Sequence, residues 1–436
     1  MKPIKLAALA LSAVLFFSAC TYIPEPDGVP VPDESDTPTV TEPPETQPTG
    51  TEQTDGAITT PSEPIVRPPA PPTINEISDY ADFDERIAEI ASSLDVVGLG
   101  LCVFADGEPI YAVNYGYADL EAGIPADCDT VYRSASVSKL ISTVVLMTLY
   151  DQGKIDIDSD LEELTGIPYN DPEAEKTVRL RHLLTHTSGL YDSEAYGDSY
   201  LQLSDLEFVI GRSHSEHEPG THYSYSNLGM GTLGAIVERL TGEFFHYYAD
   251  RVLFKPLGMG AAYCVDLIGS RENAANLYQD GELVGMPKNW GRTTAYYELY
   301  GLGNSYHSSQ GELLITTADL ARLGVILAGD GSLNGVRIIS EEAVKLINTT
   351  AFSDDKQPFD MGLAVRKYNG NFVPDRTIYG HPGQAWGSVN GLYYDPEDGT
   401  GVAICSVGCS IEVNEDNGVY LLLDKCVNEV YGTFFS

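Results

Sequence analysis

The chain has 436 residues and a formal net charge of −39 at pH 7, because 64 acidic residues outnumber 25 basic ones. So acidic a protein is a poor match for nucleic acid or for the surface of an anionic membrane, and it favours small, neutral or cationic partners. The length allows two or three domains, or one domain with insertions.

The N-terminus has the pattern of an export signal. Two lysines precede the apolar run at residues 6–17, and small residues lead to Cys20, which predicts a signal peptide over 1–19. The run is too short for an ordinary membrane-spanning helix. The four residues that end at Cys20 resemble a bacterial lipobox, which implies lipidation of Cys20 and an anchor on the outer face of the cell membrane. A plainly cleaved signal and a secreted protein are the alternative.

Residues 20–75 differ in composition from the rest of the chain. They hold 14 of the 26 prolines and ten acidic residues against one basic residue, without regular apolar spacing. Such a segment cannot bury enough apolar surface to fold, so it is predicted to be a disordered, extended tether. We expect it to hold a folded domain, residues 76–436, away from the membrane. Six further cysteines are scattered without Cys-x-x-Cys spacing, which favours buried free thiols.

The first part of the folded domain combines a helix with a hairpin. Apolar residues spaced three and four apart predict a helix over 76–95. A buried strand at 96–105 and a hairpin partner at 109–118 follow. The segment 137–152 is apolar on more than one face, which is typical of a central buried helix.

Helical patterns prevail from 155 to 300, although 265–310 lacks a clear period and is expected to be irregular. The later elements are predicted to be helices at 317–327 and 340–347, strands at 361–365, 376–380, 388–394 and 401–407, and a last helix at 414–434. Strands at both chain ends with helices between them predict an α/β (α+β) fold. It has an antiparallel sheet of about five strands flanked by helices (about 76–145 and 300–436) and an inserted, mainly helical domain (about 146–300).

Ser136 and Lys139 lie three residues apart at the start of the predicted helix 137–152. Residues three apart share a helix face, so the lysine ammonium can reach the serine hydroxyl. A serine hydroxyl is a weak nucleophile unless a base lies beside it, and this spacing supplies one. Ser-x-x-Lys is a short pattern that also occurs by chance, so it needs support from the rest of the chain.

Tyr225 and Asn227 precede another predicted helix, at 228–240. Side chains two apart in an extended loop point the same way, so both can face one cleft. A phenol beside a lysine ammonium can have its anion stabilised and serve as a base. For this tripeptide alone, a loop tyrosine that packs its ring and turns its hydroxyl to solvent is the simpler interpretation.

Glycines surround His381 and Pro382 just after the predicted strand 376–380. Glycine allows a second backbone or a ligand to approach closely, and a free backbone N–H beside such a strand can donate to a developing oxyanion. Taken alone, this stretch indicates an edge-strand turn with a satisfied histidine.

Together and in this order, the three stretches resemble the penicillin-recognising serine hydrolases, which include class C β-lactamases, serine D-Ala-D-Ala carboxypeptidases, D-aminopeptidases and related esterases. The three family motifs correspond, in chain order, to Ser136-x-x-Lys139, Tyr225-Ser226-Asn227 and His381-Pro382-Gly383. Connecting stretches at 178–190 and 255–259 are also similar to the family. The resemblance covers roughly 80–430 and implies a β-lactamase/transpeptidase-like fold.

The resemblance also implies roles for single residues. Ser136 would attack a carbonyl and become acylated, while Lys139 and Tyr225 would share its proton. Asn227 would bind the amide side of the substrate, and the backbone N–H groups of Ser136 and Gln384 would form the oxyanion hole. No cofactor and no metal ion is implied.

The third motif departs from the family, in which it is usually Lys-Thr-Gly. His381 stands in place of the lysine, and Pro382 in place of a hydroxyl residue. A neutral imidazole attracts a carboxylate far less than a permanent cation does. His381 and Gly383 are still expected to line the substrate site, but the substrate class stays open among D-amino-acid peptides, β-lactams and esters. The expected partner is a small-molecule or peptide substrate, with peptidoglycan stem peptides as one candidate, and no oligomeric state is predicted.

Three other interpretations compete with this one. A zinc hydrolase would use His182 and His186, with a second group at 214–217, but the pair lacks the glutamate of a zincin helix. An α/β-hydrolase would require a Gly-x-Ser-x-Gly elbow, which the sequence lacks. A non-catalytic lipoprotein could keep the fold to bind a wall peptide or a β-lactam, although a mere binder needs no base beside its serine.

Overall fold

The computed structural model describes residues 80–199, 204–287 and 293–436. The predicted signal peptide, the tether and Cys20 lie outside the described residues. None of the helices in the described part of the chain combines the length and hydropathy that a membrane span requires. The six cysteines in this part are free, and five of them are buried, whereas Cys128 is exposed.

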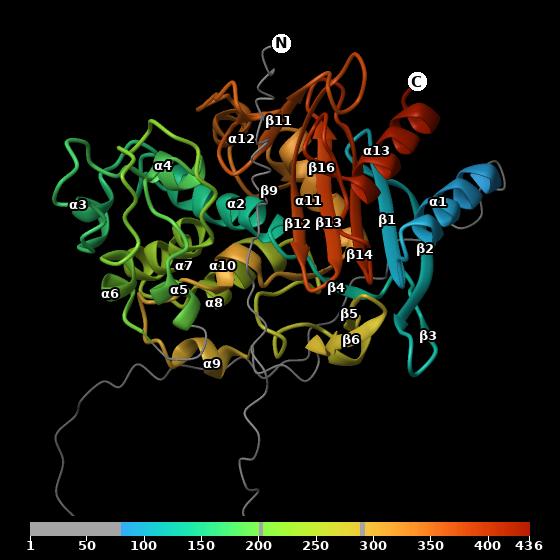
Figure 1. The fold of residues 1–436 in the computed structure, drawn as a ribbon, viewed down its shortest axis with the longest axis horizontal. Coiled ribbons are helices and arrows are strands. Elements are labelled where there is room, and N and C mark those ends of the chain that lie inside the picture. Colours follow the sequence, from blue (N-terminus) through green and yellow to red (C-terminus); the bar gives the residue numbers. More distant parts are fainter. Residues whose placement is uncertain (1–79, 200–203, 288–292) are drawn as a thin grey trace, which may run out of the picture. The chain divides into compact units, whose positions relative to one another are not determined.

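The predicted fold class is confirmed, because the core is an antiparallel sheet flanked by helices (Figure 1). Its strands are β1 (Gly98–Ala105), β2 (Glu108–Asp119), β3 (Ile124–Pro125), β10 (Asp360–Met361), β11 (Arg366–Asn369), β12 (Thr377–Ala385), β13 (Ser388–Asp395) and β14 (Thr400–Val407). Their spatial order is β10-β11-β12-β13-β14-β1-β2-β3, so a strand from the start of the described residues, β1, pairs with a strand near their end, β14.

The helices are α1 (Ala81–Ser93), α2 (Val137–Asp151), α3 (Leu161–Thr165), α4 (Leu180–Leu184), α5 (Glu194–Asp198), α6 (Leu206–Ile210), α7 (Asn227–Thr241), α8 (Phe245–Ala249), α9 (Thr294–Glu298), α10 (Ser308–Gly311), α11 (Thr317–Ala328), α12 (Glu341–Asn348) and α13 (Leu421–Phe434). Short strands form separate pairs: β4 (Val131–Arg133) with β7 (Leu314–Thr316), β5 (Leu277–Gln279) with β6 (Glu282–Gly285), β8 (Ser332–Leu333) with β9 (Val336–Arg337), and β15 (Val413–Asn414) with β16 (Val419–Tyr420). A π-helical turn, Asp250–Phe254, continues α8, and a 3₁₀ turn spans Arg271–Asn273.

Helices cover both faces of the sheet. Leu101 and Val103 of β1 share a core with α1 and α13, which lie side by side in Figure 1. Phe104 points to the other face, where it meets α11 so closely that a Cβ on Gly324 would come within 2.5 Å of its ring. Because both faces are covered, all eight residues of β1 are buried, and its sequence is a continuous apolar run without alternation.

The structure differs from the sequence prediction mainly in short elements. The sheet has eight strands because β3, β10 and β11 add two to four residues each, too few for an alternating pattern to reveal. The segment 265–310, predicted to be irregular, holds equally short strands and helices. The prediction of a strand at 361–365 is wrong, because Ala364 adopts a φ of +57° and the chain turns there between β10 and β11.

Two boundaries also differ from the prediction. The last helix begins at Leu421, because the residues before it form the β15–β16 pair. The strand predicted to end at residue 380 continues to Ala385. His381 and its neighbours therefore lie within β12 and not in a turn after it.

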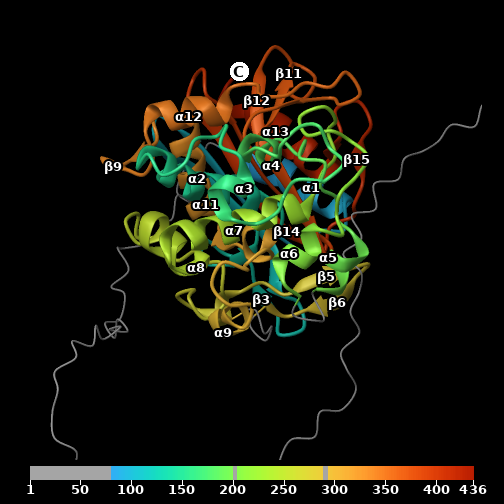
Figure 2. The same cartoon turned by 90° about the vertical axis from the view of Figure 1, so that its left-hand side faces the viewer.

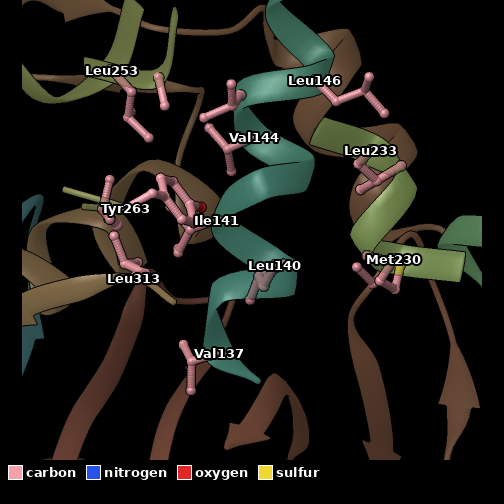
Figure 3. Close-up of a cluster of buried hydrophobic side chains, with 14 of the residues drawn as sticks. Val137, Leu140, Ile141, Val144, Leu146, Met230, Leu233, Leu253, Tyr263 and Leu313 are labelled. Carbon is pink, nitrogen blue, oxygen red and sulfur yellow. The ribbon is translucent and has the colours of Figure 1, made fainter. Parts of the chain in front are cut away.

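Helix α2 lies between the sheet and the helices α3–α8, as Figures 1 and 2 show from two directions. Every residue from Val137 to Leu149 is buried. Figure 3 shows the α2 side chains Ile141 and Val144 pointing toward Tyr263 and Leu253, while Met230 and Leu233 of α7 lie on the other side. Cutting back a buried leucine of this kind to alanine costs about 2–5 kcal/mol. This packing fixes the axis of α2 and hence the place of its first turn.

Glu238 of α7 is a fully buried carboxyl group. It accepts hydrogen bonds from the backbone N–H groups of Phe245 (3.1 Å), Gly303 (2.7 Å) and Ser305 (3.3 Å). Burial outweighs these bonds and raises the pKa of Glu238 from 4.5 to about 7. A carboxyl whose pKa is raised by folding stabilises the fold fully below its unfolded pKa, and this stabilisation is lost as the pH rises through the folded value.

We therefore expect the melting temperature to fall between pH 5 and pH 8, and this part of the fall to be absent in Glu238→Gln, which cannot ionise. The full effect corresponds to about 3 kcal/mol. Calorimetry over this pH range on the wild type, Glu238→Gln and the exposed control Glu341→Gln measures it. Parallel pH profiles for the wild type and Glu238→Gln would contradict the expectation, whatever the absolute stability of the variant.

Candidate active site

A sharp turn between β4 and α2 presents Ser136. The backbone N–H of Ser134 donates to the carbonyl of Leu313 (2.8 Å), which continues the pairing of β4 with β7. Ala135 then adopts a φ of +48°, a left-handed conformation that is costly for a residue with a Cβ atom. From residue 131 to 139, every residue except Ser136 is buried. The turn therefore exposes one hydroxyl at the N-terminus of a rigid helix.

Lys139 is fully buried one helical turn further on. Its Nζ lies 2.9 Å from Ser136 Oγ, 2.8 Å from Asn227 Oδ1 and 2.7 Å from the backbone oxygen of Gln310. The two carbonyl-type oxygens can only accept hydrogen bonds, whereas a serine hydroxyl can also donate. A neutral Lys139 would thus use two N–H groups on its two shortest contacts, Asn227 Oδ1 and the backbone oxygen of Gln310, and turn its lone pair toward Ser136. The side-chain oxygen of Gln310 lies farther from Nζ, at 3.4 Å.

Tyr225 is a second side chain that lies beside Ser136. Its phenol interacts with the Ser136 side chain, and Lys139 Nζ lies 5.0 Å from the centroid of its ring. Burial raises the pKa of Tyr225 above its usual value, and this effect outweighs the opposing influence of Ser136 and of the Arg366 cation. The phenol therefore carries its proton at neutral pH, and the anion considered from the sequence is not the resting form.

Asn227 is the first residue of α7, whose start is capped by Ser226 through a 2.9 Å bond from the N–H of Gly229. While Asn227 Oδ1 accepts from Lys139, its Nδ2 donates to Asp192 (2.8 Å). Both ends of the side-chain amide are thus held by the protein. The structure brings together Ser136, Lys139, Tyr225 and Asn227, four of the residues singled out in the sequence.

Strand β12 lies directly against the Ser136 turn. Its neighbour β11 pairs only with residues 377–380, so the edge from His381 onward is open on that side. The turn packs against this part of the strand, and a Cβ atom on Gly383 would lie 2.4 Å from the carbonyl oxygen of Ser134 and 3.0 Å from the nitrogen of Ser136. Only glycine permits this approach.

Two backbone N–H groups flank the open edge. Ser136 N–H makes no hydrogen bond among the described residues, and it lies at the N-terminus of α2, where the helix dipole favours negative charge. Gln384 pairs with Val389, whose own N–H donates to Ser406 on β14. This pair is therefore of the non-hydrogen-bonded kind, in which the N–H of Gln384 points away from β13 toward the turn.

His381 is only 1% exposed. Its Nδ1 lies 2.6 Å from the carbonyl oxygen of Pro382, so this nitrogen carries the hydrogen and donates. Burial lowers the pKa of His381 well below 6.5, and the nearby Arg366 cation adds to this effect, so the ring is neutral. The ring lies 6.3 Å from that of Tyr225. His381 thus lies beside the site, but little of its surface is open to a substrate.

Several groups at the site were not found from the sequence. Gln310 contributes a backbone oxygen, which no sequence pattern marks. Asp192 holds Asn227 from a loop far away in the chain. Arg366 is half-buried on β11, opposite Gly380, with its guanidinium 4.4 Å from the ring centroid of Phe359, and it joins the site only through strand pairing.

The two histidines of the zinc alternative have separate roles. His182 Nδ1 accepts the N–H of Arg179 (3.1 Å), and His186 Nδ1 accepts that of Ser226 (3.2 Å). The described residues contain no group of three or more His, Cys, Asp or Glu side chains placed to hold a metal ion.

Comparison with known proteins identifies the family of the chain. The sequence model of the family described as Beta-lactamase matches residues 83–408. The class that the fold and family define is a serine hydrolase, and the chain belongs to the β-lactamase family.

Individual relatives differ in name. Penicillin-binding protein 4 of Amycolatopsis lactamdurans is 28% identical over 343 residues, which is 76% of this chain and 86% of that protein. Esterase EstB of Burkholderia gladioli is 33% identical over 221 residues, or 46% and 54% of the two chains. The structure of a D-alanine carboxypeptidase from Burkholderia cenocepacia superposes with a TM-score of 0.61 at 20% identity, covering 81% of this chain and 99% of that one. At this identity the likeness concerns the fold.

Proposed function

We propose that the protein forms an acyl-enzyme on Ser136 and hydrolyses D-amino-acid peptides in the manner of a D-Ala-D-Ala carboxypeptidase, or related small amides and esters. The observation that carries the proposal is the 2.9 Å contact between Lys139 Nζ and Ser136 Oγ, with the phenol of Tyr225 beside the same side chain. A protein that only binds its ligand has no need of a base beside a serine.

In the proposed first step, the Ser136 hydroxyl passes its proton to the lone pair of neutral Lys139 while Oγ bonds to the substrate carbonyl carbon. The carbonyl oxygen becomes an oxyanion between the N–H groups of Ser136 and Gln384. Preorganised backbone donors of this kind are worth about 10²- to 10³-fold in rate each.

In the second step, the oxyanion reforms the carbonyl and the bond to the leaving group breaks. Tyr225, which carries its proton at neutral pH, donates it to the leaving nitrogen or oxygen, and Lys139 returns a proton to the phenol. Water then attacks the acyl carbon and gives a proton to the same pair. The bond between this carbon and Ser136 Oγ breaks, and the pair returns the proton to Oγ, which restores the Ser136 hydroxyl. Tyr225 thus acts first as an acid, in agreement with the raised pKa of its phenol.

The neutral, buried His381 supports a site that does not require a strong carboxylate clamp. For this reason both amides and esters belong to the proposal. D-amino-acid substrates are favoured by the carboxypeptidase neighbour and by the penicillin-binding relative. If Cys20 is lipidated, the tether would place the site within reach of peptidoglycan stem peptides. A class C-like β-lactamase or an esterase is the alternative, and a non-catalytic binder is a further one.

The test is covalent capture. The purified full-length chain is incubated separately with a fluorescent penicillin, 4-nitrophenyl acetate and a D-Ala-D-Ala peptide, and acylation is followed by intact mass, turnover by product release. We expect an adduct or turnover with at least one compound, its absence in Ser136→Ala, and its retention in Ser134→Ala, which removes a hydroxyl from the same turn.

The pattern of turnover identifies the substrate class. Release of D-alanine supports the proposal, rapid hydrolysis of the penicillin supports the β-lactamase alternative, and hydrolysis of the ester alone supports the esterase. If no compound gives an adduct or a product, and the wild type behaves like Ser136→Ala, the protein is a binder and not a hydrolase.

A further inference from the structure

One histidine holds the loop that carries Tyr225 at three points. The backbone oxygen of His186 accepts the N–H of Ser224 at 2.8 Å. Its Nδ1 accepts the N–H of Ser226 at 3.2 Å. Its ring stacks on the ring of Tyr225, with centroids 4.3 Å apart and planes inclined by 29°. The residue before Tyr225, the residue after it and the phenol ring itself therefore all contact the same side chain or its backbone.

The backbone of His186 has an uncommon conformation that fits this role. It follows the end of α4, where its N–H donates to the carbonyl of Leu183 (3.1 Å), and its φ is +56°. Residues other than glycine rarely adopt this left-handed conformation, although histidine does so more often than most. Such conformations persist where the surrounding contacts impose them, and they gather at functional sites.

The tautomer of His186 follows from its contacts. Because Nδ1 accepts a hydrogen bond, the ring hydrogen is on Nε2, which is buried and has no partner among the described residues. Burial, with the positive charge of Arg366 in addition, lowers the pKa of His186 well below 6.5. A protonated ring would lose the acceptor for Ser226 and would place a second cation near Arg366. The contact therefore persists across the neutral pH range.

From these contacts we infer that His186 is a positioning residue, which holds the phenol of Tyr225 in line with Ser136 and Lys139 and acts on the reaction only through Tyr225. The inference rests on the proposed function of Ser136 and Tyr225. A displacement of about 1 Å in a reacting group can cost about 10²-fold in rate, so loss of this support is expected to be visible in kcat.

The experiment tests separately the two contributions of the His186 side chain, namely its stacking ring and its hydrogen-bond acceptor. His186→Phe keeps a stacking face and loses the acceptor for Ser226, whereas His186→Asn keeps a polar acceptor and loses the ring. The matched control is His182→Asn, since His182 also accepts a backbone N–H through Nδ1 but makes no ring contact with Tyr225. Acylation by 4-nitrophenyl acetate is measured as release of 4-nitrophenol and as mass gain on the full-length protein. Circular dichroism melts report folding.

We expect kcat to fall about 10- to 100-fold in His186→Phe or His186→Asn, with KM changed less than about threefold, and the control to stay within about twofold. In a Tyr225→Phe background the same substitutions should have no further effect, because the phenol that they misplace is already absent. A structural role alone would reduce activity equally in both backgrounds, together with the melting temperature.

Two results would overturn the inference: wild-type kcat in both His186 variants, or equal losses with and without the Tyr225 hydroxyl. The Ser136→Ala variant in the same assay distinguishes a failure of the His186 inference from a failure of the proposed function. If Ser136→Ala retains activity, the proposed function itself is contradicted. If Ser136→Ala loses activity and the His186 variants keep it, only the inferred role of His186 is contradicted.

Discussion

Replacing Lys139 with methionine is expected to lower the rate of Ser136 acylation by about 10³- to 10⁴-fold, near the upper end of what a positioned base contributes. Methionine has a similar length and no nitrogen, so the Ser136 hydroxyl loses the atom 2.9 Å away that can take its proton. The measurement is the single-turnover rate of 4-nitrophenol release from 4-nitrophenyl acetate. Lys154→Met, at an exposed lysine just after α2, is the matched control and should leave the rate unchanged.

Lys139→Arg distinguishes a base from a mere cation. Arginine keeps the charge but cannot be deprotonated in a protein. If Lys139 acts as a base, Lys139→Arg should be as slow as Lys139→Met, provided that melts show both to be folded. Substantial recovery by arginine would show that only the positive charge matters, and the proton would then have to leave Ser136 by another route.

Replacing Gly383 with alanine is expected to lower kcat by 10²-fold or more. The new Cβ atom would lie 2.4 Å from the carbonyl oxygen of Ser134 and 3.0 Å from the nitrogen of Ser136, and these are backbone atoms that cannot rotate away. Either β12 or the turn must shift, which separates the N–H groups of Gln384 and Ser136. Overpacking of this kind also costs about 1–3 kcal/mol of stability.

Kinetics and melting of Gly383→Ala are compared with those of Gly432→Ala, because a Cβ atom on Gly432 in α13 meets no atom within 4 Å. The control should keep full activity and equal or higher stability, since alanine favours the helix. Wild-type kcat in Gly383→Ala would show that the contact between β12 and the turn does not set the geometry of the site.

Local features of this protein could be predicted from its sequence. The long helices α1, α2 and α11 and the strands β1, β2, β13 and β14 lie near their predicted positions, because each has enough residues for a period of 3.6 or a continuous apolar run to emerge. The proximity of Ser136 and Lys139 is local as well, since a spacing of three on one helix places both on one face. Strands of two to four residues were missed, because so short a segment has no period to detect.

The rest of the site depended on contacts between distant parts of the chain. Gln310 enters it through a backbone oxygen and Arg366 through the pairing of β11 with β12, neither of which a motif records. The sequence pointed to Tyr225 as a possible anion, but its ionisation is set by burial, which raises the pKa of the phenol and outweighs the nearby charges.

The sequence by itself therefore determined the fold class and the residue types that could supply a nucleophile and a base. Only the tertiary structure decided which edge of β12 stays open, which donors face Ser136 and which form of Tyr225 is present. The physical reason is that periodicity and spacing describe interactions within one element. Strand register, close backbone approach and desolvation arise only when distant elements pack together.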